Sequence, residues 1–120
     1  MTGPVLSSNE LLKHNKLTLQ DIETWELNEA FATQVLGCLA AWNDDKFCRD
    51  RVGLTGKLGE IDRSRMNIKG GSVALGHPFA ATGGRILATL AKIIDQNGGG
   101  RGLVSICAAG GLGVTAILER

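Results

Sequence analysis

The stretch from Lys69 to Ile86, KGGSVALGHPFAATGGRI, limits what this chain can fold into more than any other. The apolar run VAL at 73–75 lies between glycines, which predicts a short, fully buried strand. His77 follows this run. Pro78 lacks a backbone donor and holds φ near the helical value, so it suits the first position of a helix. We therefore expect a strand, a turn that carries His77 and a helix start in direct succession.

Small residues occupy positions 80–84 of this expected helix, so that another backbone or a ligand can approach closely. A helix N-terminus also favours negative charge. On its own, a histidine beside a helix start is more often a capping residue without a chemical role. The case for chemistry at His77 therefore rests on the rest of the chain.

Composition narrows the class of protein. The 120 residues suit one domain, and a net charge of +1 gives no reason to expect a nucleic-acid partner. No apolar run reaches about 18 residues, so we expect no membrane span. The three cysteines are odd in number and none forms a CxxC pair, which argues against a disulfide framework and a zinc or other metal site. We expect a protein of a reducing compartment.

The first 28 residues predict a helix and then a strand. After an extended lead-in over residues 1–6, Ser7 and Glu10 form a capping-box pattern, which predicts a helix to about Asn15. Thr18 is expected to cap a brief turn. Residues 22–27, IETWEL, alternate apolar and polar side chains, which is typical of a half-buried strand. This strand is expected to end at Asn28.

The next segment changes to a helical period, with Glu29 in the first turn. One apolar stripe is formed by Phe31, Val35, Cys38, Leu39 and Trp42. Cys38 is interpreted as a core residue because it lies on this stripe. Residues 43–67 are irregular, with one short helix expected over 45–51 and no chemistry expected at Cys48.

The C-terminal part predicts a helix and a hairpin. The helix that follows His77 should bury Ile86, Leu87, Leu90, Ala91, Ile93 and Ile94 and stop at Asn97-Gly98. Residues 103–107, LVSIC, predict a second buried strand. The glycines at 110–113 should turn the chain into a hairpin partner over 114–118.

Asn28, His77 and Cys107 each follow an expected strand. Residues just beyond the carboxyl ends of neighbouring strands converge on one crevice of an open α/β sheet. An imidazole and a carboxamide can donate hydrogen bonds to a developing oxyanion, while a thiol can shuttle a proton. Glycines after Cys107 free backbone N–H groups for a second oxyanion. Oxyanion donors and a proton-transferring group are what carbon–carbon bond formation or cleavage beside a thioester carbonyl requires.

Three stretches carry a resemblance to a known family: WELNEAFA at 25–32, GGSVALGHPFAATGGRI at 70–86 and CAAGGLGVTAILE at 107–119. They closely resemble the three C-terminal motifs of the thiolases, the acetyl-CoA acyltransferases. Their order and spacing also match, and with GPV at 3–5 the resemblance covers essentially all 120 residues. The sequence PFAATG at 78–83 is more similar to that of the fatty-acid-oxidation branch, the 3-ketoacyl-CoA thiolases, than to that of the biosynthetic branch.

The resemblance implies a role for each candidate residue. Asn28 would hold a water that forms, with His77, an oxyanion hole for the thioester oxygen. Cys107 would be the general acid/base for the incoming thiol or the substrate α-carbon. The backbone N–H of residue 109, an alanine here and a glycine in many thiolases, would contribute to a second oxyanion hole. The residues expected to line the substrate and CoA are Phe31, Ala109 and Gly110.

The resemblance also implies partners and location. Coenzyme A and acyl-CoA would be substrates, and no resident cofactor is expected. A fatty-acid-oxidation complex could contain the protein as a subunit. We expect it in the cytoplasm, or in the mitochondrial matrix of a eukaryote.

The expected fold is the α/β C-terminal half of a thiolase over residues 1–120, a mixed sheet flanked by helices. Thiolases resemble two fused α/β halves, and the nucleophilic cysteine belongs to the N-terminal half. Neither Cys38 nor Cys48 lies in a nucleophile motif. The first residues of the chain resemble the family just after the first, central strand. We therefore expect a truncated fragment, inactive alone, that forms a homo-oligomer, a swapped dimer or a rearranged sheet.

Three other interpretations compete with a catalytic thiolase domain. The chain could be a folded binding or oligomerisation module without turnover. The ketoacyl synthases share the fold, but Asn28 in ELNEAF together with Cys107 favours a thiolase. A nucleotide-binding domain is disfavoured because no G-x-G-x-x-G opens a helix.

Overall fold

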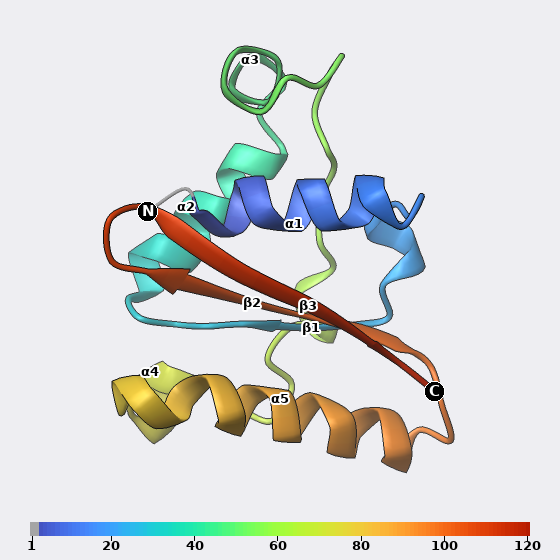
Figure 1. Ribbon diagram of the computed structural model, residues 1–120, viewed down its shortest axis with the longest axis vertical. Helices are drawn as coiled ribbons and strands as arrows, with labels where there is room; N and C mark the ends of the chain where they lie inside the picture. Colours follow the sequence, from blue (N-terminus) through green and yellow to red (C-terminus); the bar gives the residue numbers. More distant parts are fainter. Residues whose placement is uncertain (1–2) are drawn as a thin grey trace.

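The computed structural model describes residues 3–120, which form three layers (Figure 1). The middle layer is a three-stranded sheet of β1 (Thr24–Leu27), β2 (Arg101–Ala108) and β3 (Leu112–Glu119), in that order. One face is covered by α1 (Gly3–His14) and α2 (Ala32–Trp42), and the other by α5 (Phe79–Gln96). The expected mixed sheet flanked by helices is confirmed.

The sheet is parallel on one side and antiparallel on the other. β1 runs parallel to β2, with Leu27 opposite Ser105, and β2 pairs with β3 as an antiparallel hairpin. The strands predicted over 22–27 and 103–107 and the hairpin are therefore confirmed. β1 is shorter than expected, and all four of its residues are buried rather than alternating. Helices cover both faces of the sheet, so its polar positions are enclosed as well.

Two apolar clusters hold the layers together. The larger lies between the sheet and α1/α2, where the rings of Trp25 and Trp42 lie 5.9 Å apart. The smaller lies between the sheet and α5 and contains Ile86, Leu90, Ile94 and Val104. Side chains of successive strand residues therefore enter different clusters, and this alternation assigns each residue of β1 and β2 to one face.

α1 begins earlier than the sequence predicts. Residues 3–6 belong to the helix, so an extended lead-in is wrong for them, while Met1 and Thr2 lie outside the described residues. Ser7 is inside α1 and not its cap, and its hydroxyl lies 2.6 Å from that of Thr115 on β3. A Cβ on Gly113 would collide with the backbone of Gly3. Close packing on β3 thus accounts for the early start of α1.

Short helical turns follow the sequence prediction more closely. Thr18 caps the turn η1 (Leu19–Asp21) through a capping box, as expected. The helix expected over 45–51 is present as α3 (Asp45–Phe47) and a π-helical turn η2 (Cys48–Val52). A further turn, η3 (Arg63–Arg65), lies in the irregular segment.

The strand expected at 73–75 is wrong. This segment forms a one-turn helix, α4 (Ser72–Leu75), and Val73 and Leu75 are 68% and 63% exposed. The turn is held from outside, because the Glu29 carboxylate accepts from the backbone N–H of Val73 at 3.0 Å. A Cβ on Gly71 would collide with that carboxylate. Contact with a distant side chain, and not the local apolar pattern, therefore decides the conformation here.

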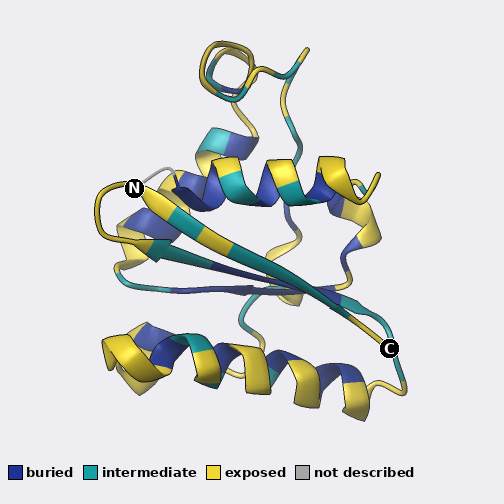
Figure 2. Ribbon diagram, in the orientation of Figure 1, coloured by how far each residue is buried: buried dark blue, intermediate teal, exposed yellow. Residues whose placement is uncertain are grey.

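The two longer helices differ in detail from their predicted stripes. α2 buries Val35, Cys38 and Trp42 as expected, but Phe31 is its N-cap and is 63% exposed, and Glu29 precedes the first turn. α5 ends at Asn97-Gly98 as predicted. Its buried face consists of Thr82, Ile86, Leu90, Ile93 and Ile94 (Figure 2). The expectation that Leu87 and Ala91 are buried is wrong, because both face solvent.

Asn67 closes the outer edge of β1. Its backbone N–H donates to the carbonyl oxygen of Trp25 at 2.8 Å. Its side-chain Oδ1 accepts from the backbone N–H of Leu27, and its Nδ2 donates to the carbonyl of Leu27, both at 2.9 Å. The side-chain amide thus pairs with β1 as the backbone of another strand would. It satisfies polar groups that an open edge leaves unpaired.

Candidate active site

Asn28 lies directly after β1 and is 1% exposed. Its backbone N–H donates to the carbonyl oxygen of Ser105 at 2.9 Å, which places Asn28 beside β2 at the level of Ile106. The side-chain Oδ1 accepts from the hydroxyl of Ser72 at 2.9 Å. The Nδ2 group is buried and has no hydrogen-bond partner within residues 3–120. Asn28 therefore offers a desolvated donor at the carboxyl end of β1.

His77 lies in the turn between α4 and α5. Its Nδ1 is 2.7 Å from the hydroxyl of Thr82, which lies 3.0 Å from the carbonyl oxygen of Pro78. The hydroxyl has one proton and serves one of these acceptors at a time. When it donates to Nδ1, the neutral ring carries its proton on Nε2. The edge of the ring contacts Phe79 at a centroid distance of 5.0 Å. Pro78 is the N-cap and not the first helical residue, so His77 lies beside the cap, as expected.

Cys107 is half-buried in β2, one residue beyond the level of Asn28. Leu103 belongs to the cluster under α1/α2, while Val104 and Ile106 pack with the α5 cluster. By alternation, Cys107 faces α2. Burial raises the pKa of the Cys38 thiol on α2, a hydrogen bond from Gln34 opposes this, and the neighbouring Cys107 thiol raises that pKa further. The two thiols are therefore close enough to interact.

The three candidate residues come together differently from the prediction. Asn28 and Cys107 follow or end neighbouring parallel strands, as expected. His77, however, follows a helical turn, so the hypothesis of three strand ends is wrong for this residue. Within residues 3–120 no hydrogen bond joins the three side chains directly. The link runs through Ser72 of α4, which bonds Asn28 and lies five positions before His77.

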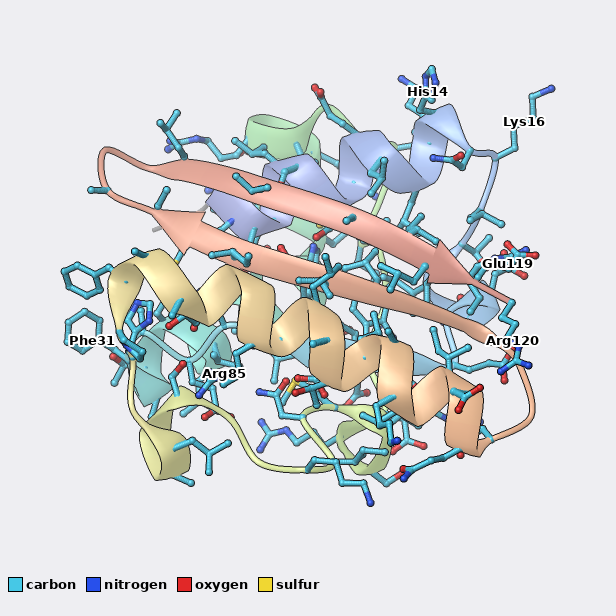
Figure 3. All side chains as sticks on the ribbon, turned by 60° about the horizontal axis from the view of Figure 1, so that its bottom comes forward. His14, Lys16, Phe31, Arg85, Glu119 and Arg120 are labelled. Carbon is cyan, nitrogen blue, oxygen red and sulfur yellow. The ribbon has the colours of Figure 1, made fainter. Side chains whose placement is uncertain are left out.

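The turn after Cys107 spans residues 109–111, and β3 begins at Leu112. Gly113 is therefore part of the strand and not of the predicted turn, opposite Cys107. Gly110 and Gly111 have φ of 83° and 81°, a left-handed conformation that favours glycine. Ala109 and Gly110 are exposed, as are the rings of Phe31 and Phe79. In Figure 3, Phe31 lies at the end of the molecule where α5 begins.

The buried carboxylate of Glu26, two residues before Asn28, is a feature that the sequence pattern does not predict. Glu26 is 1% exposed on the α5 face of β1, and its Oε1 has no hydrogen-bond partner within the described chain. Burial, reinforced by Glu29, raises the pKa of Glu26 to about 7, while Arg85 opposes the rise. The alternation in IETWEL had placed Glu26 on a solvent face. Glu26 is buried because α5 covers this face of the sheet, and the local sequence pattern does not reveal that cover.

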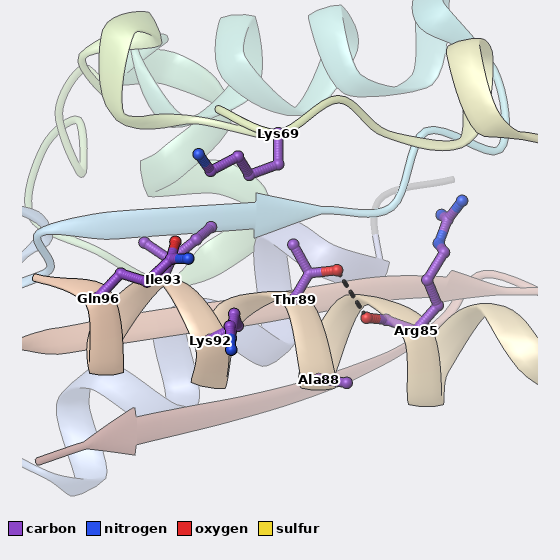
Figure 4. A pocket seen from close by; sticks show the side chains of 7 residues that line it. All are labelled: Lys69, Arg85, Ala88, Thr89, Lys92, Ile93 and Gln96. Atoms are coloured by element: carbon purple, nitrogen blue, oxygen red, sulfur yellow. Dashed lines mark hydrogen bonds between the residues drawn. The ribbon is translucent and has the colours of Figure 1, made fainter.

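A separate open cavity of about 470 Å³ lies along α5 (Figure 4). Its lining consists of Lys69, Arg85, Ala88, Thr89, Lys92, Ile93 and Gln96. It runs from Arg85 away from the start of α5 and so away from His77. Within residues 3–120 no cluster of three or more side chains suited to a metal ion is found. None of the described helices is both long and apolar enough to span a membrane.

Comparison with known proteins bears directly on this geometry. The family model described as "Thiolase, C-terminal domain" matches residues 1–120. A 3-ketoacyl-CoA thiolase of Shewanella baltica (strain OS185) is 43% identical over 119 residues, which are 99% of this chain and 27% of the relative. One from Enterobacter sp. (strain 638) is 44% identical with the same coverage. The chain therefore spans about a quarter of the length of these curated relatives.

Two solved structures of related enzymes have the same fold as this chain. The peroxisomal 3-ketoacyl-CoA thiolase of Saccharomyces cerevisiae superposes with a TM-score of 0.78 at 35% identity, over 99% of this chain and 29% of that chain. An acetyl-CoA acetyltransferase from Syntrophomonas wolfei superposes with a TM-score of 0.79 at 32% identity, over 98% and 27%. The yeast enzyme is described as built from two core domains of identical topology.

Proposed function

The chain belongs to the thiolase family as a C-terminal domain, and from this premise we propose that it supplies half of an active site for the thiolysis of 3-oxoacyl-CoA. The products would be acetyl-CoA and a shortened acyl-CoA, and the reverse reaction is the Claisen condensation. One observation carries the proposal: within residues 3–120 the buried Nδ2 donor of Asn28 has no partner, and it lies beside the carboxyl end of β2, which carries Cys107. Asn28 is also bonded to Ser72, in the helical turn that precedes His77.

Asn28 and His77 would stabilise the thioester oxyanion. A water that accepts from Asn28 Nδ2 has both of its protons free to donate to the substrate oxygen. Nε2 of His77 can supply the second donor when the hydroxyl of Thr82 donates to Nδ1. Donors that are oriented before the reaction stabilise charge as it develops, and losing one costs a factor of about 100–1,000 in kcat.

Cys107 would transfer the proton. In the thiolysis direction its thiolate takes the proton of the incoming CoA thiol, which can then attack the acyl carbonyl. In condensation it takes a proton from the α-carbon of the acetyl group and leaves an enolate. A half-buried thiol near the carboxyl end of the central strand is accessible to such a proton donor.

Coenzyme A is proposed as a substrate, and no resident cofactor is needed for this chemistry. The exposed ring of Phe31 suits an apolar contact with the pantetheine arm. The backbone N–H groups of the turn at Ala109, Gly110 and Gly111 would form a second oxyanion hole, and the left-handed conformation of its two glycines suits such a turn. The nucleophilic cysteine is expected in another half of the enzyme, so we propose that this chain is inactive alone.

The proposed partners are that nucleophile-bearing half and a second copy of this chain, within a fatty-acid-oxidation system. Around the site, large apolar side chains are exposed on several elements: Phe31, Val73, Leu75, Phe79, Leu112 and Val114. Such surface is typical of an interface. Light scattering of the purified chain should give more than the monomer mass of 12.6 kDa, and a monodisperse monomer would contradict self-association.

The alternative is a folded binding module that has lost turnover, and one experiment separates the two. This chain is substituted for the matching 119 residues of the Shewanella baltica enzyme, which supplies the rest of the site. Cleavage of acetoacetyl-CoA and of a longer 3-oxoacyl-CoA is then measured with CoA. The proposal requires CoA-dependent cleavage by the chimera and none by this chain alone.

Matched variants assign the roles within this chimera. His77→Ala and Cys107→Ala should each lower kcat at least 100-fold. His14→Ala and Cys48→Ala are the controls, because His14 lies far from Phe31 in Figure 3 and the Cys48 thiol donates to the carbonyl of Ala41. A folded chimera without turnover supports the inert module. Near-normal rates in His77→Ala or Cys107→Ala would overturn the roles proposed for them.

A further inference from the structure

The Arg85 guanidinium connects both parts of the candidate site. Its Nη1 donates to the carbonyl oxygen of Gly76, the residue before His77, at 3.0 Å. Its Nη2 donates to the hydroxyl of Ser72 at 2.8 Å, and that hydroxyl donates to Asn28 Oδ1 at 2.9 Å. One chain of hydrogen bonds therefore runs from the His77 turn to Asn28.

The direction of this chain follows from the chemistry of its first member. A guanidinium has five N–H donors and no acceptor, so Ser72 can only accept from Arg85. The single hydroxyl proton of Ser72 is donated to Asn28 Oδ1, and an Nδ2 group turned toward Ser72 would deprive that proton of its acceptor in a buried site. Because the two ends of an amide have nearly the same shape, such polarity is decided only by hydrogen-bond partners. By donating to Ser72, Arg85 orients that hydroxyl so that its proton points to Asn28 Oδ1, which leaves Nδ2 as the free group.

Burial makes this polarity costly to reverse. Ser72 is 6% exposed and Asn28 is 1% exposed, so solvent cannot readily replace a lost partner. Arg85 also lies close enough to Glu26 to lower the pKa of that buried carboxyl against the effect of burial. Its position is thus held by two hydrogen bonds and by one nearby charge. A lysine offers a single ammonium without the planar fork and cannot reproduce both bonds in this geometry.

We propose that Arg85 is a positioning residue, which orients the Asn28 amide through Ser72 and fixes the backbone before His77. This inference rests on the proposed function, in which Asn28 Nδ2 serves the oxyanion. Without Arg85, the Ser72 hydroxyl loses the donor that orients it, so it can turn its proton away from Asn28 and accept from Nδ2 after the amide rotates by 180°. Oδ1 would then take one proton of the proposed water, which would have one proton left for the developing oxyanion instead of two.

The orientation is tested without any activity measurement, by NMR of the labelled 120-residue chain. In the unsubstituted chain, nuclear Overhauser effects between the Asn28 Nδ2 protons and the β-protons of Ser72 should be weak, because the oxygen faces Ser72. In Arg85→Met they should grow at least twofold. Arg49→Met is the matched control, since among the described residues Arg49 pairs only with the exposed Asp45, and it should leave them unchanged. An unchanged pattern in a folded Arg85→Met chain overturns the proposal.

Two further variants keep the proposal testable if the Arg85→Met chain does not fold. Arg85→Lys keeps the charge, and Ser72→Ala breaks the same connection while leaving Arg85 in place. Arg85→Lys should shift the Overhauser pattern toward that of Arg85→Met. In Ser72→Ala the line width of the Asn28 amide should broaden, because no partner then selects one orientation. Native-like Asn28 signals in both variants would also overturn the proposal.

The effect of the Arg85 substitutions on the reaction is measured in the chimera with the Shewanella baltica enzyme. Arg85→Met should lower kcat about 10- to 100-fold and change KM less than threefold, with Arg85→Lys in between. If the Asn28 amide is reoriented in Arg85→Met but kcat does not fall, the positioning role of Arg85 is overturned. If His77→Ala and Cys107→Ala were also without effect, the proposed function would fail as well. These two failures are therefore distinguishable.

Discussion

Asn28 and Cys107 lie on neighbouring strands within one residue of the same level, but their side chains leave opposite faces of the sheet. Asn28 faces α4 and α5 through Ser72, whereas Cys107 faces α2. In the proposed thiolysis, one acyl group would reach both only by crossing the carboxyl ends of the strands. The exposed glycine turn after Cys107 leaves these ends accessible.

Thr82→Val tests how His77 is oriented. The substitution removes the hydroxyl 2.7 Å from Nδ1 with little change in shape, so the ring loses the partner that selects its tautomer. We expect kcat of the chimera to fall about tenfold, which corresponds to about 1.4 kcal/mol of transition-state stabilisation. The nitrogen chemical shifts of His77 in the 120-residue chain should also show a mixture of tautomers.

Thr89→Val is the matched control for this prediction. Thr89 lies on the same helix, and its hydroxyl donates to the carbonyl of Arg85 at 2.9 Å, as the hydroxyl of Thr82 can to that of Pro78. It does not contact His77. Equal losses of kcat in both variants would show that the helix, and not the bond to Nδ1, is responsible.

Glu26 should make the stability of the domain depend on pH. Burial and the neighbouring Glu29 raise its pKa from 4.5 to about 7, so the folded state binds this proton more tightly than the unfolded state does. The resulting stabilisation is fully present below about pH 4.5 and is lost as pH rises to about 7. At 1.36 kcal/mol for each pKa unit, the loss is at most about 3 kcal/mol.

Glu26→Gln should remove this loss. Urea unfolding from pH 4.5 to 8 would show a decline in the wild-type chain that is absent in the variant. Glu10→Gln, at an exposed position on α1, should retain the wild-type decline. Parallel curves for the wild-type chain and Glu26→Gln would contradict a buried, protonated Glu26.

Asn67 should be important for stability although it lies in an irregular segment. Asn67→Gly removes the side-chain bonds to Leu27 and the 2.7 Å bond to Glu29. At about 1 kcal/mol for each bond, the free energy of unfolding should fall by about 2–3 kcal/mol. Asn67→Ala should cost about 1 kcal/mol more, because φ at this position is 50° and alanine resists the left-handed conformation. Urea unfolding in which alanine equals glycine would contradict this strain.

Two glycines should respond in opposite directions to alanine. At Gly113 a Cβ would collide with the backbone of Gly3, so Gly113→Ala should destabilise the domain by about 1–3 kcal/mol. At Gly37, within α2, a Cβ would contact nothing within 4 Å. Gly37→Ala should therefore stabilise the domain by about 0.5–1 kcal/mol. Thermal unfolding of both variants measures the contrast, and a loss of stability at Gly37 would contradict the open space described there.

Local sequence determined much of this protein. The hairpin over β2 and β3, the end of α5 at Asn97-Gly98 and the capped turn after Thr18 depend on neighbours a few residues apart, so their patterns are visible in the chain. The family motifs likewise placed Asn28, His77 and Cys107 in one region. Their chemical roles remain predictions, because roles depend on a bound substrate.

Tertiary structure decided the rest. Residues 73–75 are helical because Glu29, 44 positions before Val73, holds the first turn. Glu26 is buried because a helix covers a face that the alternating pattern had assigned to solvent. The polarity of the Asn28 amide depends on Ser72 and, through it, on Arg85. A hydrogen bond between distant residues leaves no period in the sequence, and its donor and acceptor are known only once the fold has brought them together.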